Sequence, residues 1–200
     1  MSLATITLVD AETLDAVTGL LEAQLREHEI TTSRDDLRAV AQTVIADRRH
    51  GFMLVARAPD GSPIGVAYAS SLLSLEHGGA SGWIEELYVL PQWRGRGIGS
   101  RLIAEVVARA KESGWRALDL EVESSHQRAI SLYARHQFQP HSGSDFTGFS
   151  EMRLRTSHCR SIEESADWLA ISQRCIPKSD RSHSSPWSST VTRAPLRLSR

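Results

Sequence analysis

The sequence predicts an α/β protein in which helices and strands pack around one sheet. Some short segments alternate apolar and polar residues with a period of two, which is typical of strands, and others repeat apolar residues every 3.6 positions. The two kinds of segment interleave along residues 1–155, as in an α/β sandwich. The clearest helix spans residues 99–112, and its apolar face consists of Leu102, Ile103, Val106, Val107 and Ala110.

The first half of the chain contains two expected helices and a hairpin. Asp10 is a suitable N-cap for the first helix. Ser33 and Asp36 resemble a capping box at the start of the second. The turn Pro-Asp-Gly-Ser at 59–62 separates the two strands of the hairpin. The predicted elements are a strand at 5–9, helices at 11–27 and 34–47, and strands at 52–58 and 64–75.

The second half continues the alternation. A Gly-Gly break at 78–79 precedes a strand that Pro91 closes, and Gly114 ends the long helix. The predicted elements are a strand at 83–90, the helix at 99–112, a strand at 116–123, a helix at 127–136 and a closing strand at 146–154.

Composition is that of a soluble globular protein. Hydrophobic residues make up 40% of the 200 positions, charged residues 24%, and the net charge is −1. No apolar segment approaches the ~18–20 residues that span a bilayer, and the N-terminus lacks a secretory signal pattern. Cys159 and Cys175 lack metal-ligand spacing, so we expect free thiols in a reducing cytoplasm, with a disulfide as the alternative. We expect no metal, nucleic-acid or membrane partner.

Residues 156–200 differ in composition from residues 1–155. The first segment carries a net charge of −4, whereas the second carries +3, contains 11 serines and has few large apolar residues. Such a segment buries too little apolar surface to offset its ordering entropy, so we expect a disordered Ser/Arg-rich tail. A partner-binding tail, a lid over the active site and an extension without a role all stay open. We place the domain boundary near residue 155.

Residues 92–100, Gln-Trp-Arg-Gly-Arg-Gly-Ile-Gly-Ser, predict an anion site. Glycines at alternate positions let the backbone approach a ligand and present successive N–H groups to it. The helix that follows adds unpaired N–H groups and its positive dipole end. Arg94 and Arg96 either add charge to this site or form only a solvated basic turn. The combination favours a phosphate ligand.

The order of elements and these residues resemble the GNAT superfamily of acyl-CoA-dependent N-acyltransferases. Leu-Tyr-Val-Leu-Pro at 87–91, followed by Arg-Gly-Arg-Gly-Ile-Gly-Ser-Arg-Leu at 94–102, fits the family's Q/R-x-x-G-x-G/A loop. Ala-Ile-Ser-Leu-Tyr at 129–133 agrees with the family as well. The resemblance covers residues 1–155. It implies a mixed, mostly antiparallel sheet with helices on both faces, splayed around an acyl-CoA cleft.

The resemblance implies where acetyl-CoA would bind. His126 stands where the family usually has asparagine, and either bonds the pantetheine or caps the following helix. Gln137 stands where the family usually has glycine, so it either adopts a left-handed conformation or marks a reshaped turn. The backbone on the strand would bond the pantetheine arm and the loop amides would bond the pyrophosphate. The implied residues are Leu87, Tyr88, Val89, Arg94, Gly95, Arg96, Gly97, Ile98, Gly99, Ser100 and His126.

Acetyl transfer to an amine needs a base and a stabilised leaving group. An alkylammonium with a pKa near ~10.4 is about three units from neutrality at pH 7, a handicap of ~4–5 kcal/mol. Glu85 matches the position where some small-amine acetyltransferases of the family carry a catalytic glutamate, and Glu86 is the alternative. Strand alternation sends the two to opposite faces unless a bulge intervenes. Tyr133 matches the tyrosine that donates to the CoA sulfur, or else is a core residue.

We therefore expect an N-acetyltransferase that moves an acetyl group from acetyl-CoA to a primary amine of a small molecule. Residues 1–155 contain no cysteine to carry an acyl intermediate, so direct attack in a ternary complex is expected. A protein or peptide acceptor and a non-catalytic acyl-CoA sensor are the alternatives. We expect a monomer or a homodimer.

Overall fold

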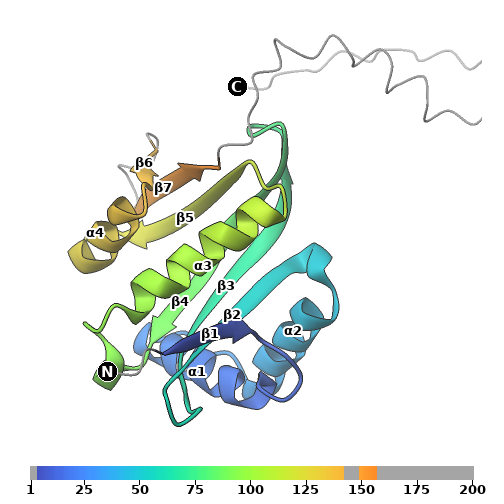
Figure 1. The fold of residues 1–200 in the computed structure, drawn as a ribbon, viewed down its shortest axis with the longest axis vertical. Coiled ribbons are helices and arrows are strands. Elements are labelled where there is room, and N and C mark those ends of the chain that lie inside the picture. The colour runs from blue at the N-terminus through green and yellow to red at the C-terminus, as the bar shows by residue number, and fades with distance from the viewer. Residues whose placement is uncertain (1–3, 142–148, 157–200) are drawn as a thin grey trace, which may run out of the picture. The chain divides into compact units, whose positions relative to one another are not determined.

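The computed structural model describes residues 4–141 and 149–156, which form one seven-stranded sheet with helices on both faces (Figure 1). The strand order is β1-β2-β3-β4-β5-β7-β6, and within this sheet every neighbouring pair except β4–β5 is antiparallel. The predicted mixed, mostly antiparallel sheet is confirmed. The strands are β1 (Thr5–Leu8), β2 (Gly51–Arg57), β3 (Pro63–Ser74), β4 (Gly79–Val89), β5 (Ala117–Glu123), β6 (Gln139–Pro140) and β7 (Phe149–Arg155).

The helices bury a core against each face of the sheet. The α-helices are α1 (Leu14–Glu27), α2 (Arg34–Ala46), α3 (Ile98–Glu112) and α4 (Gln127–Arg135), with short 3-10 turns η1 (Arg48–His50) and η2 (Pro91–Trp93). On one face, α3 inserts Leu102, Ile103 and Val106, all fully buried as its apolar periodicity predicts. On the other face, α1 and α2 contribute Val17 and Val44 to a second cluster.

Most element positions agree with the sequence expectations, and the exceptions have local causes. Ser33 Oγ accepts the N–H of Asp36 at 3.1 Å, which confirms the predicted N-cap of α2. Asp10 does not cap α1 directly, because Asp10 and Thr13 exchange backbone-to-side-chain hydrogen bonds of 2.9 Å in a turn, and the helix begins at Leu14.

Two strands differ more from expectation. β4 begins at Gly79, four residues before the predicted start, where it pairs with Ser74. The two-residue strand β6 carries no detectable alternation and was not predicted. Residues 146–148 of the expected closing strand and residues 157–200 of the expected tail lie outside the described residues.

β4 and β5 diverge after a short parallel contact. Among the described residues they pair at Gly82–Leu118 and Trp83–Asp119 alone. Beyond these pairs β4 continues along β3 as far as Val89, whereas β5 continues along β7 (Figure 1). The backbone of β4 after Trp83 therefore has a hydrogen-bonded neighbour on one side only, and this part of β4 leads into the loop before α3.

Candidate active site

The glycine-arginine loop, residues 94–100, follows η2 and includes the first three residues of α3. Gly95 and Gly97 have φ values of +76° and +78°, a left-handed conformation that favours glycine. A Cβ at either position would meet no atom within 4 Å. Glycine is therefore favoured at these positions by the backbone conformation and not by crowding. Gly99 lies in the first turn of α3 and has no positive φ. The loop is exposed up to Gly97. The Arg94 N–H already donates to the Pro91 carbonyl at 3.2 Å, so within the described residues the loop amides left for a ligand begin at Gly95, next to the helix N-terminus.

The two loop arginines are held differently. Arg94 turns back from the loop: its Nε donates to the Val89 carbonyl at 2.8 Å, and its guanidinium pairs with the Glu27 carboxylate at 2.7 Å. Arg96 lies over the Trp93 ring at 4.8 Å and is exposed, and it forms no ion pair among the described residues. Arg96 is thus the more available cation, while Arg94 fastens the loop to α1.

The backbone of β4 leaves hydrogen-bonding groups free on the side away from β3. The Leu90 N–H donates to the Ile64 carbonyl of β3 at 3.0 Å. Because backbone groups of successive residues point to opposite sides of a strand, those of Tyr88 also face β3, and those of Leu87 and Val89 face the side where β5 has diverged. Of the three predicted strand positions, Leu87 and Val89 have the geometry to bond a ligand through the backbone, and Tyr88 does not.

A β-bulge in β4 places both candidate glutamates on the same face of the sheet. Tyr68 pairs with Glu86 and Ala69 pairs with Ile84, so Glu85 is an extra residue without its own partner on β3. Strict alternation would separate the two carboxylates, and the extra residue removes that separation. Both line one pocket, between the sheet and helices α1 and α2.

We call this cavity the acidic pocket. Its volume is about 190 Å³. The lining combines apolar side chains with three carboxylates, and it contains no Arg, Lys or His. The lining residues are Leu21, Leu25, Thr32, Asp36, Leu37, Val40, Met53, Tyr68, Glu85 and Glu86.

The two glutamates have different environments. Burial, and then the negative charge of Glu85, raise the pKa of Glu86 to about 7, against a hydrogen bond from Gln24 of α1 that lowers it. Glu85 is exposed, and its carboxylate accepts a hydrogen bond from Ser70 Oγ at 2.8 Å. Glu86 is therefore poised to exchange a proton near neutral pH, as a general base requires.

Tyr133 lies on α4 and belongs to the core cluster on the α3 face of the sheet. Its side chain is buried, and its ring meets Phe138 edge-on at 5.8 Å. Burial, and then the charge of Glu86, raise the pKa of Tyr133 to about 12. Within residues 4–141 and 149–156 its hydroxyl forms no hydrogen bond, so the hydroxyl is available to a ligand.

The remaining predicted residues border the same region. Ser100 Oγ lies 2.7 Å from His136 Nε2. His126 is the N-cap residue of α4, as one of the two alternatives expects, but its side chain forms no capping hydrogen bond. Its exposed ring lies 6.3 Å from that of His28, at the end of α1. Gln137 takes the left-handed conformation, with φ of +68°, as expected where the family has glycine.

Several residues of the site were not predicted. Glu27 forms the ion pair with Arg94. Gln24 donates a hydrogen bond to Glu86, and Asp36 adds a third carboxylate to the acidic pocket. They come from α1 and α2, far from β4 in the sequence. No local motif marks them, since their roles depend on how the helices pack on the sheet.

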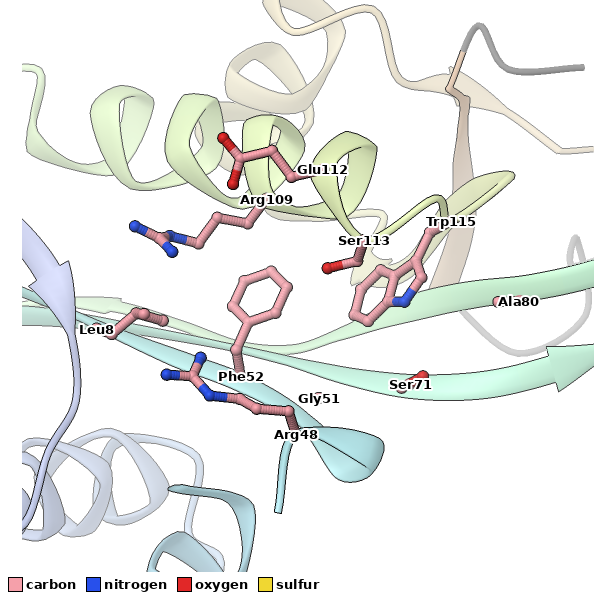
Figure 2. Close-up of a pocket in the computed structure, with 10 residues that line it drawn as sticks. All are labelled: Leu8, Arg48, Gly51, Phe52, Ser71, Ala80, Arg109, Glu112, Ser113 and Trp115. Carbon is pink, nitrogen blue, oxygen red and sulfur yellow. The ribbon is translucent and has the colours of Figure 1, made fainter. Parts of the chain in front are cut away.

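A larger pocket, of about 550 Å³, lies on the α3 face of the sheet (Figure 2). It contains none of the predicted site residues, and its lining includes the stacked pair Phe52 and Trp115 with Arg48 and Arg109 at its edge. This pocket lies on the opposite face of the sheet from Glu85 and Glu86. We therefore do not assign it as the active site, although it is larger than the acidic pocket. In the part of the chain described here, no cluster of three or more His, Cys, Asp or Glu could hold a metal ion, and no helix is long and apolar enough to cross a membrane.

A mixed sheet that divides between β4 and β5, with a glycine loop at the start of the next helix, is the architecture of a GNAT-type acyltransferase. Residues 17–138, more than half of the chain, match the Acetyltransferase (GNAT) family, and the chain belongs to this family. The predicted family and enzyme class are confirmed.

Individual relatives have varied acceptors. The chain is 32% identical to an aminoglycoside N(6')-acetyltransferase type 1 from Stenotrophomonas maltophilia, over 58% of this chain and 74% of that protein. It is 41% identical to a thialysine N-epsilon-acetyltransferase from Bos taurus, but over 26% of this chain and only 30% of the relative's length. Its fold resembles a phosphinothricin acetyltransferase from Sinorhizobium meliloti solved with AcCoA, with a TM-score of 0.66 and 22% identity over 77% of this chain and 89% of that one.

Proposed function

We propose that this protein transfers an acetyl group from acetyl-CoA to a primary amine of a small molecule, by direct attack of the amine on the thioester. The observation that carries the proposal is the order of features along β4 and the loop after it. The Glu85 bulge, the outward-facing backbone groups of Leu87 with the N–H of Val89, and the glycine-arginine loop follow one another in the chain. Relatives named for acetylating an aminoglycoside or thialysine support an amine acceptor.

The residues of the loop fit acetyl-CoA. N–H groups in an exposed loop beside a helix N-terminus suit a pyrophosphate, and Arg96 adds a positive charge that no carboxylate of the described residues pairs with. The free N–H and C=O groups of Leu87, together with the N–H of Val89, suit the amides of a pantetheine arm. When bound, acetyl-CoA supplies the activated thioester, and the protein supplies binding and proton transfer.

Glu86 is the base that the geometry favours, although the sequence pointed to Glu85 first. A base with a pKa near 7 is substantially ionised at neutral pH and can take the ammonium proton, directly or through one water. Once Glu86 has passed this proton to solvent, the neutral amine forms the C–N bond and gives its second proton to Glu86. The C–S bond breaks, and the CoA thiolate leaves and takes up a proton to become the free thiol. Glu85 lies in the same pocket, and its charge adds to the effect of burial, which is the main cause of the raised pKa of Glu86.

Tyr133 is suited to hydrogen bonding and not to full proton transfer. With the pKa of Tyr133 at about 12, transfer of its proton to a thiolate of pKa ~8.5 is uphill by roughly 5 kcal/mol. A hydrogen bond to the sulfur as negative charge develops has no such cost and stabilises the transition state.

Release of the CoA thiol, measured with acetyl-CoA and a panel of primary amines, tests the proposal. We expect one acetylated amine per thiol released, identified by mass spectrometry, and no turnover without an amine. Acetyl-CoA binding without turnover on any amine would instead identify a sensor. Turnover on peptide amines alone would instead identify a peptide N-acetyltransferase.

A further inference from the structure

We infer that the acceptor is a primary amine with a compact apolar body and no anionic group. The inference rests on the proposed function and narrows its acceptor. It depends on the size, the lining and the charge of the acidic pocket.

The volume of the acidic pocket limits the part of the acceptor that it can enclose. At about 190 Å³ it offers roughly the liquid volume of six water molecules, each taking ~30 Å³. A body of about six to nine non-hydrogen atoms fits such a space, while a substrate of several linked rings would leave most of its surface outside.

Apolar side chains make up most of the lining. α1 contributes Leu21 and Leu25, α2 contributes Leu37 and Val40, and β2 contributes Met53. A methylene chain or small ring against these walls is favoured by the removal of apolar surface from water. A hydroxyl placed against these apolar walls would lose its hydrogen bonds to water, and only the polar side chains elsewhere in the lining could replace them.

The charge of the pocket excludes a carboxylate on the acceptor. Glu85, Glu86 and Asp36 face the pocket from β4 and α2. The arginines of α2 are engaged elsewhere: Arg34 pairs with Glu22 at 3.0 Å, and Arg38 pairs with Asp15 at 3.1 Å. An amino-acid acceptor would bring its own carboxylate next to Asp36, Glu85 and the partly ionised Glu86, with no cation in the lining to compensate.

Three acceptors matched in length and in amine basicity test the inference: hexylamine, 5-aminopentan-1-ol and 5-aminopentanoate. We expect kcat/KM to fall in that order, with hexylamine at least tenfold above 5-aminopentanoate. A 5-aminopentanoate value within threefold of hexylamine, or above it, would overturn the inference while leaving the acetyltransferase function intact. Failure of every amine in the panel would overturn the function itself.

A positive charge introduced into the lining of the acidic pocket provides a second test. Val40 lines the acidic pocket and is 56% exposed, so Val40→Arg can introduce a cation without disturbing the core. We expect it to raise the ratio of kcat/KM for 5-aminopentanoate over hexylamine at least tenfold. Ala39→Arg adds the same charge at the adjacent exposed position, which does not line the pocket, and should leave the ratio unchanged. Equal ratios in the two variants would contradict the assigned pocket.

Discussion

The glycine-arginine loop and the acidic pocket lie at two ends of one stretch of chain, yet they are built differently. The loop is continuous in sequence, and its ligand-binding groups are backbone amides whose direction two glycines set. The pocket draws side chains from α1, α2, β2, β3 and β4. Recognition of the donor is thus a local property of this chain, whereas selection of the acceptor depends on tertiary packing.

The largest effect should come from breaking the loop. Gly97→Val forces a β-branched residue into a left-handed conformation at the start of α3, at a strain of ~1–3 kcal/mol, and reorients the amides. We expect at least a 100-fold loss of acetyl-CoA affinity by calorimetry. Gly114→Val is the matched control, since Gly114 also has a positive φ, +70°, and no atom near its Cβ position, but lies at the far end of α3. Equal loss of affinity in both variants would refute a binding role for the loop.

Removing the Tyr133 hydroxyl should weaken chemistry more than binding. Tyr133→Phe keeps the buried ring and its contact with Phe138 but removes the donor to the sulfur. We expect kcat to fall about 10- to 100-fold, since a donor used in the transition state is lost. The KM for acetyl-CoA should change little. Wild-type kcat in this variant would make Tyr133 a core residue only.

The buried Glu86 carboxyl of the acidic pocket should lower the free energy of unfolding at high pH. The pKa of Glu86 is about 7 in the folded protein and near 4.5 when unfolded, so between these values the folded state binds more protons and stability falls as pH rises. Glu86→Gln removes this loss. Allowing for partial exposure, we expect the variant to be more stable by about 1–2 kcal/mol at pH 8 and unchanged near pH 4, by denaturant unfolding. A stability difference that is independent of pH would contradict the raised pKa.

The smallest effect lies outside both regions. Gln137→Gly relieves a left-handed conformation after α4 and should stabilise the fold by about 0.5–1 kcal/mol. Ala134→Gly, inside α4, should destabilise it by about 1 kcal/mol. The thermal midpoints of the two variants should therefore move in opposite directions. A lower midpoint for Gln137→Gly would show that its side chain makes a stabilising contact that outweighs the strain.

The contrast between the two regions also explains what the sequence could predict. The loop, the Ser33 cap and the buried face of α3 follow from glycine conformation, capping chemistry and helical periodicity, all of which act over a few neighbouring residues. The shared face of Glu85 and Glu86 does not, because the bulge becomes visible only when β4 is paired with β3. Gln24 and Asp36 join the site through the packing of α1 and α2, which leaves no local signature.

The pH dependence of kcat/KM tests most directly whether Glu86 serves as the base. A weakly basic acceptor, already neutral above pH 6, removes the ionisation of the amine from the profile and leaves Glu86 only the proton that nitrogen loses as the C–N bond forms. We predict that kcat/KM of the wild type rises with pH through a pKa near 7. Glu85→Gln should shift this rise to lower pH, because it removes a neighbouring negative charge. Glu86→Gln should lower kcat/KM by a factor of about 10²–10³ and abolish the rise near pH 7. A Glu86→Gln variant that keeps both the rate and the rise near pH 7 would contradict the account.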